Sequence, residues 1–272
     1  MLPVVILQAM RNKKKHFNTQ KQSGSPDYQS KKIIESKPSE ASIRLNKYIA
    51  NSGVCSRREA DKLIENGEIK VDGEIVKEMG YKVQPNQVVK YHGKVLKTEK
   101  KVYLLLNKPK GFITTTHDPQ GRKTVMDLVK NACDEQVFPV GRLDRATSGL
   151  LLFTNDGDLS KKLTHPTHQI RKIYQVTLDK PITKGDFQQI IDGVKLEDGI
   201  VEVDDLGIVS EDKKVLGIEI HIGKNRIVRR LFEHLDYKVE KLDRVMFGSL
   251  TKKDLPRGKW RFLTEKEVLW LK

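Results

Sequence analysis

Two segments of this chain alternate apolar and polar residues with a period of two, and this pattern limits the fold more than any other feature. In Lys172–Leu178, the side chains of Tyr174, Val176 and Leu178 share one face. In Val215–Ile222, four apolar side chains share one face in the same way. Alternation of this kind is typical of strands that bury one face. The chain is therefore expected to contain a sheet with a buried side.

Shorter apolar runs add strands to this sheet. They lie at Val102–Leu106, Val137–Val140 and Gly149–Phe153, and turn residues follow the last of them. One helix is predicted over Asn225–Leu235. Several strands interrupted by a few helices predict an α+β domain over residues 101–272, with a mixed, mainly antiparallel sheet flanked by helices.

A smaller unit is predicted over residues 43–100. Its first helix is expected at Ile43–Asn51. A second helix begins where Ser56 and Glu59 have the spacing of a capping box, in which each side chain bonds the backbone N–H of the other residue. The Asp72-Gly73 dipeptide, between two alternating segments, is a strong signal for a hairpin turn. The unit is therefore expected to have two helices followed by a small sheet.

Residues 1–42 precede both units and show no sustained apolar period. They contain eight basic and three acidic residues and are rich in Ser, Gln and Asn, which predicts a disordered basic arm. Such an arm either attracts phosphate or is a solvated tail without a role. The first nine residues are apolar, but no basic residue precedes them, which is the wrong order for a signal peptide. Translation from Met10 would leave an ordinary basic tail.

The whole chain of 272 residues carries 51 Lys and Arg against 36 Asp and Glu, a formal net charge of +15. A surplus of this size favours a polyanionic partner, because like charges repel one another in a compact protein. No apolar run approaches the roughly 18 residues that span a membrane, so nucleic acid is favoured over a membrane. The two cysteines are too few for a disulfide scaffold or a four-cysteine zinc site, and they fit a reducing, cytoplasmic compartment.

Two residues of the larger domain are candidates for chemistry. Asp144 lies in a tight segment between two apolar strands, with Arg142 and Arg145 on either side. A carboxylate among arginines stays ionised and can act as a nucleophile, although a turn-capping carboxylate in a surface ion pair has the same spacing. Tyr174 shares its strand face with apolar residues, so on pattern alone it is a core tyrosine with a wet hydroxyl.

A cationic segment surrounds the start of the helix predicted in the larger domain. Arg226, Arg229 and Arg230 are spaced to share one helix face, and Lys224 precedes them. Arginines beside a helix N-terminus attract anions. A solvated charged face would show the same pattern, so both interpretations stay open.

In the smaller unit, Lys47, Arg57, Arg58 and Lys62 lie near the first helical turns. Basic side chains and free N–H groups there suit phosphate oxygens, although a solvated basic face has the same composition. The segment RLNKYIANSGVCSRREADKLIENGEIKVDG (44–73) resembles an S4 RNA-binding domain. That resemblance implies a helix-helix-sheet unit that binds structured RNA through its basic helical face.

Six motifs follow one another in the larger domain: LNKPKG (106–111), GRLDRATSGLLLFTNDGDL (141–159), RKIYQV (171–176), GKNRIVRRLFEHL (223–235), KLDRVMFGSL (241–250) and LPRGKW (255–260). In this order they resemble the pseudouridine synthases of the small-subunit and large-subunit rRNA type that carry an N-terminal S4 domain. Together with the S4 unit, the resemblance covers residues 43–272.

The resemblance implies roles for individual residues. Asp144 matches the catalytic aspartate. Tyr174 matches a tyrosine that stacks on or near the target base and helps to move a proton, and Arg229 matches an arginine that pairs with the catalytic carboxylate. Lys108 and Pro109 match a motif that shapes the fold near the cleft. The residues expected to hold RNA in this domain are Arg142, Arg145, Lys224, Arg226 and Arg230.

The implied reaction breaks the N1–C1′ bond of a uridine, turns the uracil and joins C5 to C1′. Substrate and product are isomers, so no cofactor or metal is needed, and the seven histidines show no zinc spacing. The aspartate would act on the sugar carbon, on the base ring, or by promoting loss of the C2′ proton, and the three routes stay open. Each route needs an ionised Asp144, which pairing with Arg229 would provide, and a base that has left its stack.

Two other function classes compete with this one. A non-catalytic RNA-binding or ribosome-assembly protein would use the S4 unit, but it would not need the set of Asp144, Tyr174 and Arg229. A retaining glycoside hydrolase also uses an aspartate nucleophile, but no partner carboxylate is evident and the basic balance is wrong for most glycans.

The expected partner is ribosomal RNA, either large-subunit RNA or a ribosome precursor. The segments DPQGR (118–122), HPTHQIRKIY (165–174) and VKLEDG (194–199) favour the large-subunit enzymes, with small-subunit RNA as the alternative target. A cytoplasmic monomer that does not bind membranes is expected.

Overall fold

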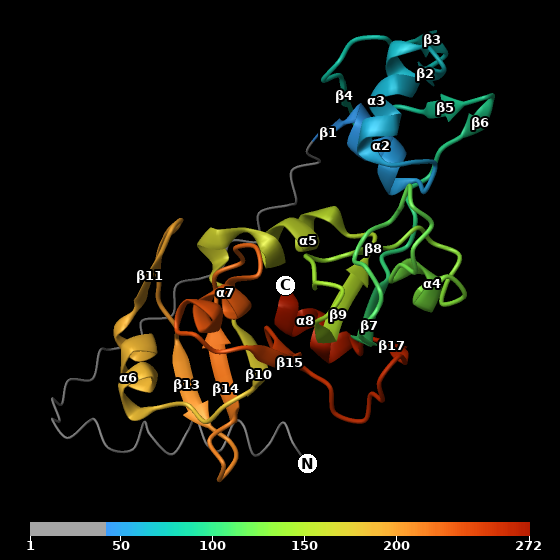
Figure 1. Cartoon of the computed structure of the whole chain (residues 1–272). Coiled ribbons are helices and arrows are strands. Elements are labelled where there is room, and N and C mark those ends of the chain that lie inside the picture. Colours follow the sequence, from blue (N-terminus) through green and yellow to red (C-terminus); the bar gives the residue numbers. More distant parts are fainter. Residues whose placement is uncertain (1–41) are drawn as a thin grey trace, which may run out of the picture. The chain divides into compact units, whose positions relative to one another are not determined.

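The computed structural model describes residues 42–272 (Figure 1). These residues form two units that divide between Lys101 and Val102. The basic arm expected over residues 1–42 and the alternative start at Met10 lie outside the described residues, apart from Ser42. Among the described residues, no helix has both the length and the apolar composition needed to cross a bilayer.

The smaller unit combines two helices with a small sheet, as expected for an S4 domain. The predicted capping box is present: the Glu59 N–H donates to the Ser56 hydroxyl at 3.3 Å, and the Ser56 N–H donates to the Glu59 carboxylate at 2.9 Å. The predicted hairpin turn has left-handed backbone at Asp72 (φ 51°) and Gly73 (φ 95°). The elements are β1 (Ile43–Arg44), α2 (Leu45–Asn51), α3 (Arg57–Glu65), β2 (Ile69–Val71), β3 (Glu74–Ile75), β4 (Lys82–Val83), β5 (Val89–Tyr91) and β6 (Lys94–Val95).

Helix α2 begins at Leu45 and not at Ile43, because Ile43 pairs with Val83 of β4 as part of a short strand. Leu45 and Ile49 lie one turn apart and are buried together. Helix α3 contributes two more buried apolar side chains at the same spacing. The small core of this unit therefore forms where the two helices meet the strands.

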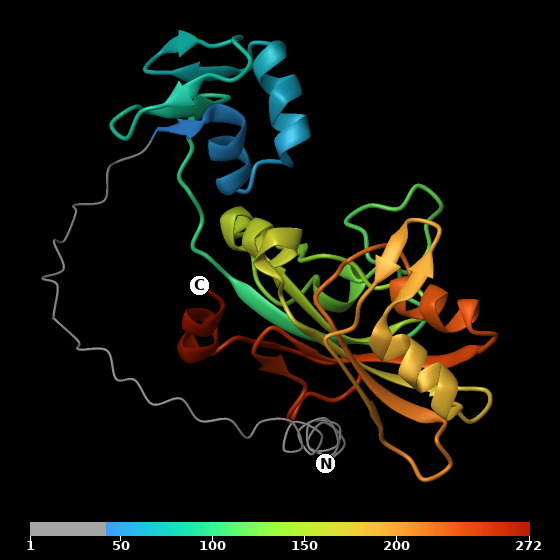
Figure 2. The same cartoon turned by 90° about the vertical axis from the view of Figure 1, so that its left-hand side faces the viewer.

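The larger unit is built on a nine-stranded sheet that is mixed and mainly antiparallel, as predicted (Figures 1 and 2). Seven strands follow the order β13-β14-β10-β15-β9-β7-β17, while β8 pairs with β9 and β16 with β15. The sheet strands are β7 (Tyr103–Lys108), β8 (Phe138–Pro139), β9 (Ser148–Thr154), β10 (Lys172–Leu178), β13 (Asp205–Ile208), β14 (Val215–Ile220), β15 (Val239–Phe247), β16 (Leu250–Thr251) and β17 (Trp260–Phe262).

Helices cover both faces of this sheet. One apolar cluster joins it to α4, α6 and α7, and another joins it to α5 and α8. In β9, Leu151 and Phe153 belong to the first cluster, and Leu150 and Leu152 to the second. Because both faces are buried, this strand is a continuous apolar run in the sequence. The remaining elements are α4 (Met126–Val129), α5 (Gly157–Thr164), the 3-10 helix η1 (Pro166–His168), α6 (Lys184–Asp192), the hairpin of β11 (Val194–Leu196) and β12 (Gly199–Val201), α7 (Ile227–His234) and α8 (Glu265–Leu271).

Strands β15 and β9 run parallel where they meet, with Asp243 opposite Ser148 and Arg244 opposite Gly149. The two backbones approach so closely that a Cβ on Gly149 would lie 2.3 Å from the Arg244 carbonyl oxygen. Gly149 also has a φ of 114°, which L side chains rarely adopt. Glycine is therefore required at this point of the sheet.

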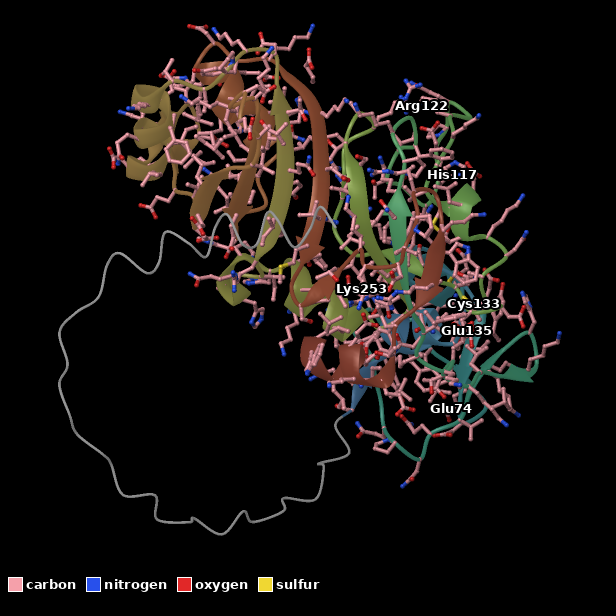
Figure 3. The ribbon with its side chains drawn as sticks, turned by 90° about the horizontal axis from the view of Figure 1, so that it is seen from below. Glu74, His117, Arg122, Cys133, Glu135 and Lys253 are labelled. Atoms are coloured by element: carbon pink, nitrogen blue, oxygen red, sulfur yellow. The ribbon has the colours of Figure 1, made fainter. Side chains whose placement is uncertain are left out.

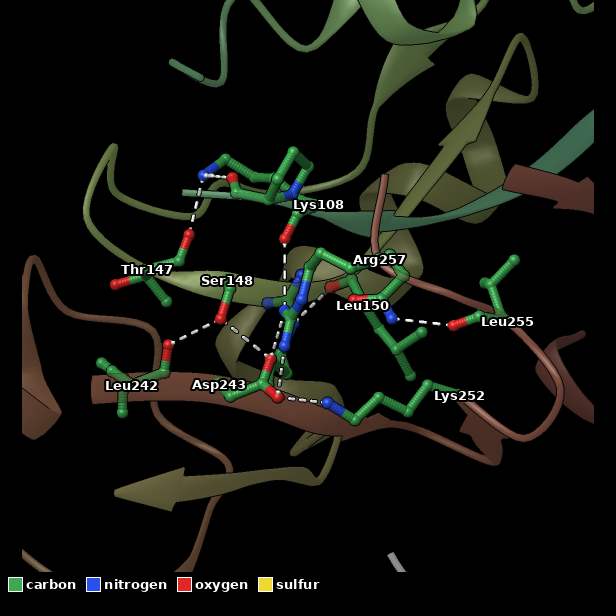
Figure 4. Close-up of polar contacts among 12 residues, drawn as sticks. Lys108, Thr147, Ser148, Leu150, Leu242, Asp243, Lys252, Leu255 and Arg257 are labelled. Carbon is green, nitrogen blue, oxygen red and sulfur yellow. Dashed lines mark hydrogen bonds and ion pairs between the residues drawn. The ribbon is translucent and has the colours of Figure 1, made fainter. Parts of the chain in front are cut away.

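A buried carboxylate strengthens the same junction (Figure 4). Asp243 accepts hydrogen bonds from the Ser148 hydroxyl at 3.1 Å and from both Nη atoms of Arg257 at 2.9 and 3.1 Å, and it also pairs closely with Lys252. Burial favours the neutral acid, but the hydrogen bonds from Arg257 and Lys252 outweigh it and lower the pKa of Asp243. Arg257 also donates to the Lys108 carbonyl oxygen at 3.4 Å. The segment after β16 is thus tied to strands β7, β9 and β15.

Both cysteines are free thiols. Burial and the charge of Glu59 raise the pKa of Cys55 to about 11. Burial and the charge of Glu135 raise the pKa of Cys133, whose Sγ lies 3.6 Å from the Glu135 carbonyl oxygen (Figure 3). A raised pKa keeps both thiols protonated at neutral pH, so neither is an activated nucleophile.

Replacement of Gly149 by alanine is expected to lower the free energy of unfolding by about 3 kcal/mol, because the new Cβ collides with the β15 backbone and the φ is unfavourable. Gly157→Ala is the matched control, since nothing lies within 4 Å of a Cβ at that position in α5. Urea denaturation of both variants measures the difference. Equal stability of the two variants would contradict the close approach of the strands.

Candidate active site

A cleft of about 630 Å³ opens on the larger unit and is lined by strands β10, β14 and β15 and by the loops before β9 and α7. Asp144 reaches the cleft from the loop between β8 and β9, and Tyr174 reaches it from β10. A second cavity of about 460 Å³ is lined by residues 113–122 together with the Asp144 loop. Asp144 lines both cavities, as do Arg142, Leu143 and Arg226.

The loop that carries Asp144 is held through its backbone. Five successive carbonyl oxygens, those of residues 143–147, accept hydrogen bonds from other segments of the chain. The Asp144 side chain is half-buried, and within the described part of the chain its carboxylate accepts no hydrogen bond. Three of the outside donors are the Thr114 hydroxyl to Leu143 at 2.7 Å, the Gly111 N–H to Arg145 at 2.8 Å and the Arg229 guanidinium to Ala146 at 3.3 Å.

Lys108 supplies the remaining donor. Its side chain is fully buried, and its Nζ donates to the carbonyl oxygens of Asp144 at 3.0 Å, Thr147 at 2.7 Å and Pro109 at 3.2 Å. Figure 4 shows the bond to Thr147. An ammonium has three donors, so three carbonyl oxygens satisfy it. Because Lys108 ends strand β7, the core of the sheet fixes the position of the Asp144 loop.

The charge of Lys108 depends on its burial. Burial lowers the pKa of Lys108 to about 8, and the charge of Asp144 acts in the opposite direction. The ammonium form therefore predominates at neutral pH and is lost as the pH rises through about 8. The neutral amine has two N–H donors, so one of the three carbonyl oxygens would lose its partner.

Arg229 does not form the direct ion pair with Asp144 that the sequence resemblance implied. Within residues 42–272, its guanidinium instead donates to the carbonyl oxygens of Val239 at 2.9 Å and Ala146 at 3.3 Å. The side chain is buried, and burial lowers its pKa while the charge of Asp144 opposes that change. Arg229 thus acts on Asp144 through its charge and through the loop backbone, since Nη1 and Nη2 donate to backbone carbonyls while the buried Nε has no hydrogen-bond partner within residues 42–272.

The helix predicted over Asn225–Leu235 is shorter, and α7 extends over Ile227–His234. Arg226 precedes it in a left-handed conformation (φ 46°) and forms an ion pair with Glu233 at 3.1 Å. The predicted common face is present only in part, because Arg226 does pair with Glu233, whereas Arg229 is buried. Arg229 lies on the buried side of α7 among apolar residues, while Arg226 is exposed and lines both cavities.

Lys224 and Arg230 are both engaged by the turn of the β11–β12 hairpin. Arg230 donates to the two Asp198 carboxylate oxygens at 2.7 and 3.0 Å, and Lys224 donates to the Asp198 carbonyl oxygen at 2.6 Å. Lys224 lines the cleft, whereas Arg230 lines neither cavity. Of these two predicted RNA-binding residues, only Lys224 therefore lies where a ligand in the cleft could contact it.

Tyr174 is 9% exposed and belongs to the main apolar cluster of the larger unit. It lies opposite Ile218 of β14 and Arg244 of β15, and it lines the cleft together with Asp144. Within the described residues its hydroxyl makes no hydrogen bond. The structure therefore combines both interpretations of the sequence, since Tyr174 is a core residue that also reaches the cleft.

Arg142 and Arg145 flank Asp144 and are exposed. Arg142 lines both cavities, and Arg145 lines the smaller one, where its Nε also donates to the Gly111 carbonyl oxygen at 3.3 Å. With Arg226, they place three guanidinium groups around the Asp144 carboxylate. Such a rim suits the phosphate groups of a nucleic acid.

The basic residues chosen in the smaller unit come from its two helices. Arg57 and Arg58 open α3, and Lys62 follows Arg58 by one turn, so Arg58 and Lys62 share an exposed face. Arg57 also donates to the Asn46 side chain at 3.4 Å. Lys47 is half-buried on α2.

Two cations of the cleft were not among the predicted site residues. Lys172 stands two positions before Tyr174 and therefore on the same strand face, a signal that the sequence did contain. Arg244 lies opposite Tyr174 only because β15 pairs with β10, which the sequence does not reveal. Both line the cleft. Burial and the charge of Arg244 lower the pKa of Lys172 to about 8.

Two family models match the chain. Residues 43–89 match the S4 domain, and residues 102–234 match the RNA pseudouridylate synthase family. A crystal structure of a pseudouridylate synthase superimposes with a TM-score of 0.61 and 29% sequence identity, covering 85% of this chain and 100% of the other.

Several proteins are similar over most of the chain. The ribosomal large subunit pseudouridine synthase B of Bacillus subtilis (strain 168) is 41% identical, with 83% of this chain and 93% of that protein covered. An uncharacterized RNA pseudouridine synthase of Aquifex aeolicus (strain VF5) is 39% identical over 84% of this chain and 93% of that protein. A dual-specificity RNA pseudouridine synthase of Escherichia coli (strain K12) is 38% identical over 85% of this chain and 78% of that protein.

Substitution of Lys108 by methionine is expected to slow the conversion of uridine to pseudouridine in saturating RNA by about 100-fold, because a displacement of about 1 Å in a reacting group costs that much. RNA affinity should stay the same. The control is Lys110→Met, which removes an exposed lysine two residues away whose Nζ donates to Glu240. Single-turnover nucleoside analysis measures both rates, and equal rates would show that the Lys108 contacts do not position Asp144.

Proposed function

The chain belongs to the RNA pseudouridine synthases that carry an S4 domain, and we propose that it isomerises a uridine of large-subunit ribosomal RNA with Asp144 as the catalytic carboxylate. The observation that carries this assignment is the setting of Asp144. Its carboxylate has no hydrogen-bond partner within residues 42–272 and faces the cleft, while the backbone of its loop is tied at five successive carbonyl oxygens.

This setting suits each of the three chemical routes. Attack on the sugar carbon, attack on the base ring and removal of the C2′ proton all need an ionised carboxylate at a fixed position. The side chains of Lys108 and Arg229 bring positive charge close to Asp144, whose own charge raises the pKa of both groups against the effect of their burial. The routes differ in which substrate atom meets the carboxylate, and the fixed loop supports all of them.

The target base must leave its stack before the carboxylate can reach it. Unstacking costs a few kcal/mol, and least in loops and distorted helices. An aromatic side chain offsets part of this cost, since stacking on a base contributes about 1–3 kcal/mol. Tyr174, on the cleft wall with apolar neighbours, is placed for that role.

The similarity to a relative named as a large-subunit enzyme supports the choice of large-subunit RNA. A second relative is named as dual-specificity, so an additional RNA substrate is the alternative to a single target. Small-subunit RNA is the other alternative target. We propose that the protein binds this RNA as a monomer, with the S4 helices contacting the RNA backbone.

The exposed cations around the two cavities support RNA binding by the larger unit. Arg142, Arg145 and Arg226 surround Asp144, and Lys224 lines the cleft. These groups would hold phosphates on either side of the extruded nucleotide, whereas Arg230 would act through Asp198. Contacts to phosphate carry little sequence information, so they would fix the position of the RNA and leave the choice of uridine to RNA shape.

The decisive experiment expresses variants in cells that lack the gene and maps pseudouridine in both ribosomal RNAs by carbodiimide treatment and reverse transcription. The unaltered chain should restore a modification in large-subunit RNA. Asp144→Asn should restore none, because the amide is neither a base nor a nucleophile of comparable strength, while RNA affinity stays within a few-fold. Asp134→Asn, which alters an exposed aspartate outside both cavities, is the control and should restore the modification.

Two outcomes would overturn this proposal. A modification map that does not change with the gene would favour the non-catalytic RNA-binding protein. Restoration by Asp144→Asn would show that another group performs the chemistry. If the unaltered chain restores a modification in small-subunit RNA instead, the protein is still a pseudouridine synthase, but its target is small-subunit RNA.

The helical face of the S4 unit is tested by salt dependence. The double variant Arg58→Gln with Lys62→Gln should weaken RNA binding and lower the slope of log affinity against log salt by about 1 for each lost phosphate contact. The control variant Lys94→Gln with Lys97→Gln removes the same charge from exposed residues outside the helices. Filter binding at several salt concentrations gives both slopes, and identical slopes would exclude a special role for the α3 face.

A further inference from the structure

The floor of the cleft carries two cations beside Tyr174. Lys172 and Tyr174 lie two residues apart on β10, and Arg244 lies directly opposite Tyr174 on β15. Residues in such positions project from the same face of a sheet. All three line the 630 Å³ cleft that Asp144 also lines. The guanidinium of Arg244 also lies 4.8 Å from the centre of the Phe247 ring, which lines the cleft as well.

Within the described part of the chain neither cation forms an ion pair with a carboxylate, although the charge of Asp204 raises the pKa of Lys172 against the effect of burial. The Lys172 Nζ donates to the His221 carbonyl oxygen, and the Arg244 Nε donates to the Leu150 carbonyl oxygen at 2.8 Å. The Nη2 of Arg244 is buried and has no hydrogen-bond partner. Asp204, whose charge acts on Lys172, is itself paired with His221, and Glu219 is paired with Arg171.

Positive charges buried without a counter-charge cost free energy, so such a pair indicates a ligand that supplies oxygen atoms or negative charge. Arg244 is only 3% exposed and acts mainly through its charge. Lys172 is half-buried and keeps donors that can turn toward the cleft, because an ammonium has three and one is used within the chain. Of the two cations, Lys172 is therefore the one that can contact a ligand directly.

We propose that Lys172, supported by the charge of Arg244, donates a hydrogen bond to a carbonyl oxygen of the extruded uracil and stabilises the negative charge that the ring acquires when it separates from the sugar. This inference rests on the proposed function. It adds a binding residue for the base, on the same sheet face as the aromatic ring of Tyr174.

The charge balance of the reaction explains why a cation belongs there. When the N1–C1′ bond breaks, its electron pair stays with the ring, and the resulting uracil anion spreads its charge over N1, O2 and O4. The bond from C5 to C1′ then forms, C5 loses its proton, and N1 gains one, so no atom or electron enters or leaves overall. A fixed ammonium beside a carbonyl oxygen stabilises the ring most when it is charged, which lowers the barrier.

The same contact would also select the base. A uracil presents an acceptor oxygen at C4, whereas a cytosine presents an amino group there. If the contact is to O4, Lys172 meets an acceptor in uracil and another donor in cytosine, which leaves two polar groups unpaired, whereas a contact to O2 would not distinguish the two bases. Lys172 is thus proposed as a determinant of base specificity as well as of rate.

The test combines substitution of Lys172 with replacement of each uracil carbonyl oxygen by sulfur. RNA substrates carry uridine, 2-thiouridine or 4-thiouridine at the target, since sulfur is a weaker hydrogen-bond acceptor than oxygen. Single-turnover rates are measured with the full chain, its Lys172→Met variant and its Lys172→Arg variant. Lys130→Met removes an exposed lysine outside both cavities and is the control. Thermal unfolding verifies that each variant folds.

Lys172→Met is expected to slow uridine conversion by about 10- to 100-fold with RNA affinity unchanged, and Lys172→Arg should recover part of the loss. One of the two thiouridines should be converted at least several-fold more slowly than uridine by the unaltered chain, and this difference should disappear in Lys172→Met. The control should behave like the unaltered chain.

Three outcomes would overturn the inference. Conversion of uridine and both thiouridines at one rate by the unaltered chain would exclude the contact, whatever the variants do. Lys172→Met could equal Lys130→Met, or it could retain the full thiouridine effect, and either result would remove Lys172 from the base. These three outcomes leave the proposed function intact. If the chain makes no pseudouridine at all, both the proposed function and this inference are wrong.

Discussion

The site depends on one buried ammonium. Lys108 has no exposed surface, and its three donors are shared among the carbonyl oxygens of Asp144, Thr147 and Pro109. Burial of a charge is unfavourable unless it is fully hydrogen-bonded, so these carbonyls must stay in place for the fold to tolerate the charge. The loop backbone is therefore specified by the core, and we propose that its one carboxylate, that of Asp144, meets the substrate.

A second constraint lies where β9 and β15 meet in parallel. Gly149 lets the two backbones touch, and the Asp243 carboxylate joins Ser148 to cations from the segment after β16. Arg257 carries this connection to the carbonyl oxygen of Lys108 itself. Arg257, near the end of the chain, thus helps to position the Asp144 loop, which lies about a hundred residues earlier.

Local patterns predicted most of the fold. The alternation in Lys172–Leu178 gave the bounds of β10, and Ser56 with Glu59 marked the start of α3, because both features depend on nearby residues. The start of α7 was misplaced because Arg226 adopts a left-handed conformation, which an arginine rarely favours. The ion pair expected between Arg229 and Asp144 is absent from the described residues, since backbone carbonyls take the donors. The role of Arg244 depends on strand pairing that no local pattern shows.

We propose that a fixed Asp144 meets a uridine that has left its RNA stack and entered the 630 Å³ cleft. The most direct measurement is a crystal structure of the Asp144→Asn variant bound to a target fragment of large-subunit ribosomal RNA. In that structure we expect the uracil to lie against Tyr174, the side chain at position 144 to face the sugar, and the Lys108 hydrogen bonds to persist. A bound RNA whose target uridine stays stacked, or lies outside this cleft, would contradict it.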